Sequence, residues 1–339
     1  MILVTGATGL LGRIIALELV KRGRKVRACK RNGSDLSDVE NSYHFYTADA
    51  AFYFKQIEWV NIDFNNHLSV YRALKDVTEV YHCAAKVSFD PEDFEEVLET
   101  GIISTRSLLR ASMYMPVKKF LFVSSAATWD LDKATVESQI RNADEKLRYP
   151  AHVLSKYVGE KMVSSAYAQG LNTIIINPAM IIGTGNWHKN NSNLMTDFFV
   201  QSRFTFCGGT SCVDVRDVAT AAVELMERNL FGERFCIAAE NILFKNLAQK
   251  IRKTVGLGNP VVCSRNFLKA IKILRFILNF ADRRARFLTD ENIEFMSERK
   301  YYSGKKIMNA IHCSFISAED AIRFHFGNYL ADKKAGTGR

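Results

Sequence analysis

The sequence of 339 residues contains no long apolar run, and none reaches the roughly 18 residues that a membrane-spanning helix requires. We expect no secretory leader either, because a strand-like apolar run begins already at Ile2. The cysteines are odd in number and lack the spacing of a metal site; they stand singly at Cys29, Cys83, Cys207, Cys212, Cys236, Cys263 and Cys313. We therefore expect reduced thiols, no metal and a cytoplasmic protein.

Acidic residues are outnumbered by basic ones, 36 against 46, which leaves a formal net charge of +10. Such an excess suits anionic cofactors, nucleic acids or membrane surfaces in general. No nucleic-acid-binding motif accompanies the charge, so we expect a basic enzyme without a nucleic-acid partner. With 47% hydrophobic residues and no internal repeat, the chain can form a globular protein with one large and one smaller domain.

The first twelve residues, MILVTGATGLLG, combine a strand, a glycine-rich turn and the start of a helix. The consecutive apolar residues 2–4 predict a strand buried on both faces. Gly6, Gly9 and Gly12 follow, and apolar residues recur at helical spacing over 14–20. A turn of this kind lets a pyrophosphate approach the backbone amides at the positive end of a helix. The stretch therefore predicts a dinucleotide site.

Strand-like and helix-like segments alternate along the first 240 residues. Strands are expected at 25–29, 57–62, 77–84, 117–124, 173–177 and 235–238, and helices at 67–74, 91–115 and 151–169. The polar stretch 31–55 is expected to be irregular apart from a short helix at 49–54. The alternation predicts an α/β fold with a Rossmann-type, doubly wound parallel sheet.

We expect a dinucleotide-binding domain and a smaller, mainly helical substrate domain. The first comprises residues 1–180 and receives about 205–240. The second comprises 181–204 and 241–330, where the pattern is mostly helical. The polar residues 331–339 are expected to form a flexible tail.

The glycine spacing Thr5-Gly6-x-x-Gly9-x-x-Gly12 resembles that of the extended short-chain dehydrogenase/reductase superfamily. Within it, the chain looks most like the NAD-dependent epimerase/dehydratase group and the dihydroflavonol-4-reductase-like proteins, over about residues 1–240. The resemblance implies a nicotinamide dinucleotide cofactor. It also implies that the turn contacts this cofactor through Gly6, Thr8, Gly9, Leu10, Leu11 and Gly12.

Lys30 and Arg31 end the second strand, where NAD enzymes usually offer an acidic side chain to the ribose. Because arginine binds phosphate in a bidentate manner, the predicted cofactor is NADP, with NAD the less favoured choice. A solvated basic loop is the alternative. Asp63 follows the third strand and matches the family's adenine-contacting aspartate, or else it caps a helix at 65–74.

Two further stretches resemble family segments that line the cofactor. His82-Cys83-Ala84-Ala85 resembles the H-x-A-A segment, in which small residues let the backbone lie against ribose and phosphates; Lys86 follows it. The stretch 177–181 resembles the segment beside the nicotinamide, which implies contacts from Pro178 and Ile181.

The family's catalytic serine and lysine have counterparts here, but its tyrosine does not. Ser125, after Ser124 at the end of the fifth strand, matches the serine, and Lys156 in the stretch LSKYVGE matches the lysine. His152 occupies the position of the tyrosine. Imidazole exchanges protons near neutral pH, and the Lys156 charge favours its neutral form. Tyr149 could reach the site only if the helix start were rearranged, and Tyr157 must point elsewhere.

Gly101 is a second departure from the family, which usually has an asparagine there. That asparagine bends the helix and holds a water for proton relay, which glycine cannot do. Restoring it, together with a tyrosine at position 152, is expected to raise activity.

The main functional expectation is an NADP-dependent oxidoreductase acting on a carbonyl or secondary alcohol of a small or lipophilic molecule. Ser125 would position the substrate oxygen, His152 would replace the tyrosine as proton donor, and Lys156 would hold the ribose. One alternative is a catalytically degraded NADP-binding sensor or scaffold. Another is a nucleotide-sugar epimerase or dehydratase with bound NAD, against which the missing acidic residue after the second strand counts.

Two features of the C-terminal half add expectations. Asp217, in a stretch resembling the family's V-D-V-R-D-V-A element, is expected to cap a helix over 218–227. Residues 266–288 form an amphipathic pattern with apolar residues on one face and basic residues on another. This pattern fits a helix packed on its own domain, a peripheral membrane contact or a lid over the substrate. A homodimer is compatible with each of these.

Overall fold

A computed structural model describes residues 1–88, 90–129, 131–132, 134–136, 149–185, 194–277 and 288–334. Its main sheet has seven strands in the order β10-β6-β5-β4-β1-β2-β3, and all neighbouring pairs are parallel. The strands are β1 (Ile2–Thr5), β2 (Val26–Lys30), β3 (Ile57–Asn61), β4 (Glu79–His82), β5 (Lys119–Val123), β6 (Asn172–Pro178) and β10 (Arg234–Ile237). The predicted doubly wound parallel sheet is confirmed.

The strand order reverses beside β1, since β2 and β3 lie on one side of it and β4, β5 and β6 on the other. In open parallel sheets, ligands bind at the carboxyl ends of the strands at such a switch point. The glycine turn follows β1 directly, and the stretch from Cys83 follows β4. The topology therefore brings both predicted cofactor segments to one edge of the sheet.

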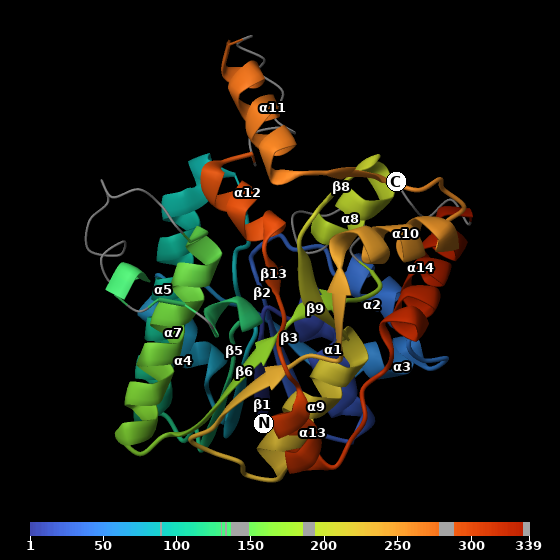
Figure 1. The fold of residues 1–339 in the computed structure, drawn as a ribbon. Helices are drawn as coiled ribbons and strands as arrows, with labels where there is room; N and C mark the ends of the chain where they lie inside the picture. The colour runs from blue at the N-terminus through green and yellow to red at the C-terminus, as the bar shows by residue number, and fades with distance from the viewer. Residues whose placement is uncertain are drawn as a thin grey trace.

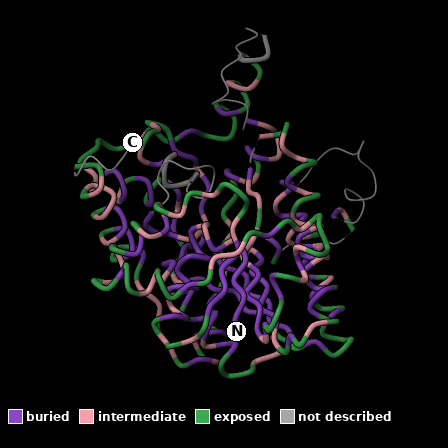
Figure 2. The backbone as a smooth tube through the Cα atoms, turned by 180° about the vertical axis from the view of Figure 1, so that it is seen from behind, coloured by how far each residue is buried: buried purple, intermediate pink, exposed green. Residues whose placement is uncertain are grey.

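Helices cover both faces of this sheet (Figure 1). On one face α1 (Leu10–Lys21) packs against α9 (Val215–Glu227); on the other lie α4 (His67–Ala73), α5 (Phe94–Tyr114) and α7 (Ala151–Ala168). Alternate strand residues enter different cores: Ile2 and Val4 join one cluster, and Leu3 joins the other. The strands are accordingly buried almost throughout in Figure 2.

The stretch 31–55 is more ordered than expected, because it contains α2 (Ser37–Tyr43) and α3 (Ala50–Lys55). The expectation of an irregular segment was wrong for 37–43. The buried side chains of Val39 and Tyr43 place α2 in the core beside α1, and the Tyr43 hydroxyl donates to the Arg13 carbonyl at 2.9 Å.

A second group of elements begins directly after β6, because only Ala179 separates β6 from β7 (Met180–Ile182). β9 (Gly209–Asp214) pairs with β7, β11 (Glu240–Leu243) and β13 (Arg299–Lys300), while β8 (Phe204–Phe206) pairs with β12 (Val261–Cys263). The surrounding helices are α8 (Leu194–Gln201), α10 (Phe244–Thr254), α11 (Arg265–Ile277), α12 (Asp290–Ser297) and α14 (Ala318–Lys334). A third apolar cluster holds these elements together. The helix α13 (Lys305–Ile311) instead packs on α9 and β10.

Asp214, not Asp217, caps α9. The helix starts at Val215, and the Asp214 carboxylate accepts the Arg216 N–H at 2.8 Å. Asp217 instead accepts the N–H of Ile316 at 2.7 Å, and burial raises its pKa to about 6. The predicted cap was therefore wrong by one turn, since both aspartates precede apolar helical residues and only the backbone path separates them.

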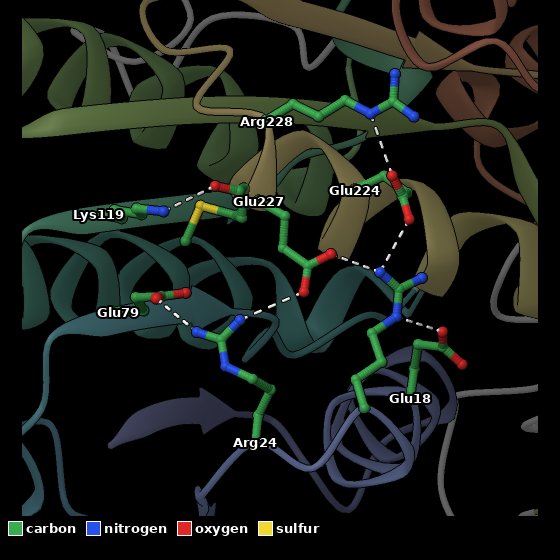
Figure 3. A network of polar contacts seen from close by, with 9 residues as sticks. Glu18, Arg24, Glu79, Lys119, Glu224, Glu227 and Arg228 are labelled. Atoms are coloured by element: carbon green, nitrogen blue, oxygen red, sulfur yellow. Dashed lines mark hydrogen bonds and ion pairs between the residues drawn. The ribbon is translucent and has the colours of Figure 1, made fainter.

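An ion-pair network joins the N-terminal βα unit to α9, more than 200 residues later in the chain (Figure 3). Arg22 contacts Glu18, Glu224 and Glu227 at 2.6–2.9 Å.

Within the described residues, no helix is long and apolar enough to cross a bilayer. All seven cysteines are free thiols.

Candidate cofactor and catalytic site

The glycine turn leaves β1 and is shaped by two close approaches. Gly6 adopts a φ of +64°, and a Cβ on it would lie 2.7 Å from the backbone nitrogen of Ala84. A Cβ on Gly12 would lie 2.3 Å from the Gly6 carbonyl oxygen. A side chain at either position would therefore push the turn away from the loop after β4 or from α1.

Gly9 has a different role, because its neighbourhood is more open. It stands just before α1, and a Cβ there would meet only the Gly6 oxygen at 3.2 Å. Within the described chain, no side chain caps α1, so the N–H groups of its first turn can serve phosphate oxygens. Leu10 and Leu11 are buried in the core, which leaves their backbone amides as the groups that could face a cofactor. Thr8 is half-buried beside them.

Arg13 supports this turn from behind and was missed in the sequence. Its side chain is fully buried, and it donates to the carbonyls of Thr8 at 2.5 Å and Gly9 at 3.2 Å. It also pairs with the Asp38 carboxylate at 3.0 Å, which ties the turn to α2. The available signal was an arginine inside an otherwise apolar helical run, a position where a charge needs several partners.

The residues predicted to contact the adenosine part of the cofactor lie at the ends of the neighbouring strands β2 and β3. Lys30 ends β2, Arg31 follows it exposed, and Lys30 lies opposite Asn61 of β3 in the ladder. Asp63 lies exposed just beyond β3. The alternative role of Asp63 as a helix cap was wrong, because the Asn66 side chain accepts the Ser69 N–H and α4 begins after it.

The segment after β4 lies against the glycine turn. The Ala84 N–H donates to the Thr5 hydroxyl at 3.3 Å, and Ala85 follows at the same edge. His82 is fully buried between the hydroxyls of Thr5 and Thr105, at 2.7 and 3.1 Å from its two ring nitrogens. Burial, with a smaller effect of the Lys156 charge, lowers its pKa to about 3. His82 is therefore a neutral structural residue.

The Lys86 ammonium is held by carboxylates at the start of α5. It lies 3.4 Å from Asp93 and 2.5 Å from Glu96. Pro178 ends β6 in a buried position, and Ile181 lies half-buried in β7. These two residues frame the other side of the sheet edge, where the family resemblance implies the nicotinamide.

Ser125 and Lys156, the candidates for the catalytic serine and lysine, both lie near the carboxyl end of β5. Lys156 Nζ donates to the Val123 carbonyl at 2.6 Å, two residues before Ser125. The Ser125 hydroxyl accepts the Ala127 N–H at 3.2 Å and is half-buried, so its own proton can be offered to a substrate. Burial lowers the pKa of Lys156 to about 8, opposed by smaller effects of Cys83 and Glu160.

His152 lies one helical turn before Lys156, near the start of α7. Burial, with a smaller effect of Lys156, lowers its pKa to about 4. The imidazole is therefore neutral at physiological pH, and Lys156 is the protonated group of the pair. The Tyr149 hydroxyl accepts the Asp132 N–H at 3.3 Å, away from β5, and Tyr157 packs near Leu131. Neither tyrosine substitutes for the missing one.

Glu160 organises the loop that carries Ser125. Its carboxylate accepts from Ser124, from Thr128 at 2.7 Å and from Asn177 at 2.6 Å, and it pairs with Arg234 at 3.2 Å. Four separate segments thus meet at one buried carboxylate, which holds the end of β5 in place.

Gly101 has a packing role that the sequence did not reveal. A Cβ there would lie 2.7 Å from the Ser155 Cβ, so α5 and α7 approach too closely for any side chain. The expectation that asparagine at position 101 would improve the site was therefore wrong, because this backbone has no space for it.

Within the described residues, no group of three or more histidine, cysteine or acidic side chains is placed to hold a metal.

Of the predicted amphipathic helix 266–288, α11 covers 265–277, and residues 278–287 lie outside the described part. Leu268 is buried, while Phe267 and Ile273 are 49% and 59% exposed. In Figure 1, α11 projects from the body of the molecule.

The sequence model of the NAD-dependent epimerase/dehydratase family matches residues 2–238. "Sterol demethylase protein B" of Methylococcus capsulatus is 26% identical over 266 residues, covering 76% of this chain and 75% of that protein. A putative dihydroflavonol 4-reductase of Synechocystis sp. is 24% identical, covering 76% and 73%. A UDP-glucuronic acid 4-epimerase of Bacillus cereus, solved with UDP-glucuronic acid and NAD, has a TM-score of 0.71 at 14% identity, covering 98% and 99% of the two chains.

Proposed function

Because this chain belongs to the NAD-dependent epimerase/dehydratase family, we propose that it is an NADP-dependent oxidoreductase. It transfers hydride between the nicotinamide and a carbonyl or secondary alcohol of a small or lipophilic molecule. The observation that carries this proposal is the meeting of Ser125 and Lys156 at the end of β5, on the sheet edge that holds the glycine turn.

The residues present fit a dinucleotide. The uncapped first turn of α1 offers amides to the pyrophosphate, and the space next to Gly9 admits it. Lys30 and Arg31 would meet the 2′-phosphate, and Asp63 would contact the adenine. Ala84 and Ala85 offer a flat backbone surface near the ribose. When bound, the nicotinamide supplies or accepts the hydride.

We infer a division of labour among the three catalytic residues. Ser125 donates a hydrogen bond to the substrate oxygen and orients it. His152, neutral because of its burial, can donate a second hydrogen bond but holds no ready proton. Lys156, protonated at neutral pH and with its pKa lowered toward 8, delivers the proton that the oxygen needs on reduction. This changes the role first expected for His152 from proton donor to hydrogen-bond donor.

The decisive experiment has a binding part and a turnover part. NADPH and NADH are titrated separately. Carbonyl substrates that include a dihydroflavonol are then screened for NADPH oxidation, and sterols, which carry a secondary alcohol, are screened for NADP⁺ reduction. These two classes follow from the names of the relatives at 26% and 24% identity. Tight NADPH binding with turnover of any carbonyl supports the proposal, and binding of neither dinucleotide refutes it.

One alternative is an NADP-binding sensor or scaffold without turnover. It is favoured by the histidine at position 152 and by the close packing at Gly101, which leaves no side chain for a water relay. Tight NADPH binding with no turnover of any carbonyl would support it. A nucleotide-sugar epimerase with bound NAD is the other alternative, and the basic residues Lys30 and Arg31 count against it.

For a lipophilic substrate, we propose that α11 makes a peripheral membrane contact. Phe267 and Ile273 expose apolar surface on this helix, and the exposed Lys269 adds a cation that can meet anionic headgroups. Wild-type protein should co-sediment with anionic lipid vesicles, and the double variant Phe267→Ser/Ile273→Ser should do so less. Equal sedimentation of both proteins would contradict this contact.

A further inference from the structure

A cavity of about 270 Å³ lies beside α7, which lines it with Tyr157, Glu160, Lys161, Ser164 and Tyr167. It is bounded by α7, by the turn after β5 and by β6 and the start of β10, at the edge of the main sheet. Ser125, His152 and Lys156 do not line it. It is therefore separate from the cofactor and substrate edge.

Arg234 and Lys161 are the two cationic side chains that line this cavity, and each has N–H groups without an acceptor among the described residues. Arg234 uses Nε for Asn177 at 3.2 Å and Nη2 for Thr128 at 2.9 Å, while its Nη1 has no partner among the described residues. Lys161 Nζ lies 5.4 Å from the centre of the Tyr157 ring and has no carboxylate partner in the described chain. An anion entering the cavity would meet both cations.

The acidic residues of the wall do not cancel this charge. Glu160 is already paired with Arg234 and hydrogen-bonded to three further groups. Glu233 is paired with Lys306 at 2.6 Å. The cavity therefore retains one uncompensated cation, on Lys161, next to a guanidinium with a free edge.

Trp129, Tyr157 and Tyr167 add aromatic rings to the wall. The Arg234 guanidinium lies 4.2 Å from the centre of the Trp129 ring, and Tyr167 is 44% exposed at the other end. The volume falls just below the roughly 300–1,000 Å³ of pockets for drug-sized molecules, which restricts it to a single ring. We propose that this cavity binds a small single-ring aromatic carboxylate, held by Lys161 and the free edge of Arg234.

Such a ligand would reach the catalytic loop through one residue. A carboxylate on the free Nη1 edge would draw the Arg234 guanidinium toward the cavity and weaken its ion pair with Glu160, which holds Ser124 and Thr128 on either side of Ser125. Occupation of the cavity should therefore lower turnover without changing NADPH affinity. This regulatory part rests on the proposed function, whereas the binding part does not, so the two can fail separately.

The binding test uses benzoate as the probe and isothermal titration calorimetry as the measurement, with benzyl alcohol as the neutral control. Wild type should bind one benzoate saturably and benzyl alcohol at least tenfold more weakly. Lys161→Ala should weaken benzoate binding about tenfold, the scale of one charge-assisted hydrogen bond. Lys118→Ala is the matched control, because Lys118 is also an exposed lysine without a carboxylate partner in the described chain but lies outside the cavity.

Absence of saturable benzoate binding to the wild type overturns the site. So does equal affinity of wild type and Lys161→Ala, or equal affinity for benzoate and benzyl alcohol. Because Lys161 is exposed on α7, its replacement should leave the circular dichroism spectrum and Tm unchanged. Benzoate that binds as expected but leaves kcat unaltered overturns only the regulatory part.

Discussion

Carbonyl reduction should fall at alkaline pH with a midpoint near 8, because Lys156 changes its protonation state there. Lys156 is a half-buried residue of α7 whose ammonium lies at the end of β5, and removal of the ammonium from water disfavours its charged form. A single group of this pKa is about nine-tenths protonated at pH 7 and about one-tenth protonated at pH 9. If Lys156 supplies the proton, the rate should drop about tenfold over these two pH units.

The assay is kcat/KM for a carbonyl substrate at saturating NADPH between pH 6 and 10. His152→Gln removes the imidazole but keeps a hydrogen-bond donor, so it should slow the reaction without moving the midpoint. Lys156→Arg keeps a cation that does not titrate in this range, and it should flatten the alkaline limb. A midpoint near 6.5 that vanishes in His152→Gln would refute the assignment, since the imidazole would then be the acid.

His152→Tyr tests the same proton transfer by placing at position 152 the tyrosine that the family has there. A phenol one turn before Lys156 would have its pKa lowered by the lysine charge and could supply the proton itself. General acids contribute roughly 10²–10⁴-fold, so a gain in rate should be easily measured. A loss of rate would mean that His152 is already the working acid. No turnover in any variant, with NADPH binding retained, would favour the sensor or scaffold.

Three further predictions concern the cofactor turn and the helix packing. Arg31→Glu should abolish or reverse the preference for NADPH over NADH in titrations. The control Arg110→Glu reverses the charge of another exposed arginine and should leave this preference unchanged. Equal affinity of the wild type for both dinucleotides would contradict the role of Arg31. Gly9→Val should keep its Tm but lose NADPH affinity. Gly12→Val should lose both NADPH affinity and stability, because its Cβ would overlap the Gly6 oxygen. NADPH binding by both folded variants would disprove a phosphate-binding turn. Gly101→Asn should cost about 1–3 kcal/mol in urea unfolding through overpacking against the helix α7, and an unchanged unfolding midpoint would show that the helices can separate.

Several features of this protein could be predicted from local sequence alone. The run 2–4, the glycine turn and the apolar helix after it are contiguous, so their conformations depend on neighbours in the chain. Strand-helix alternation then implies a parallel sheet, because parallel strands need a helical crossover. The choice of Ser125 and Lys156 as candidate catalytic residues came instead from the resemblance of their short motifs to the family.

Other features depend on contacts between distant segments, and the sequence did not reveal them. The space at Gly101 is set by Ser155, 54 positions later, and the burial of Arg13 depends on Asp38 in a helix that the composition of 31–55 did not indicate. The cap of α9 was misplaced by one turn, because Asp214 and Asp217 both precede apolar residues at helical spacing and only the backbone path shows that the helix starts at Val215.

The sequence by itself determined which chemical groups this protein carries and which strand ends present them, because those properties follow from residue type and short-range periodicity. Only the tertiary structure decided their protonation. The pKa of His152 falls to about 4 and that of Lys156 to about 8 because several distant elements pack around them and remove water. Desolvation depends on everything that surrounds a group in space, and a linear pattern does not contain that information.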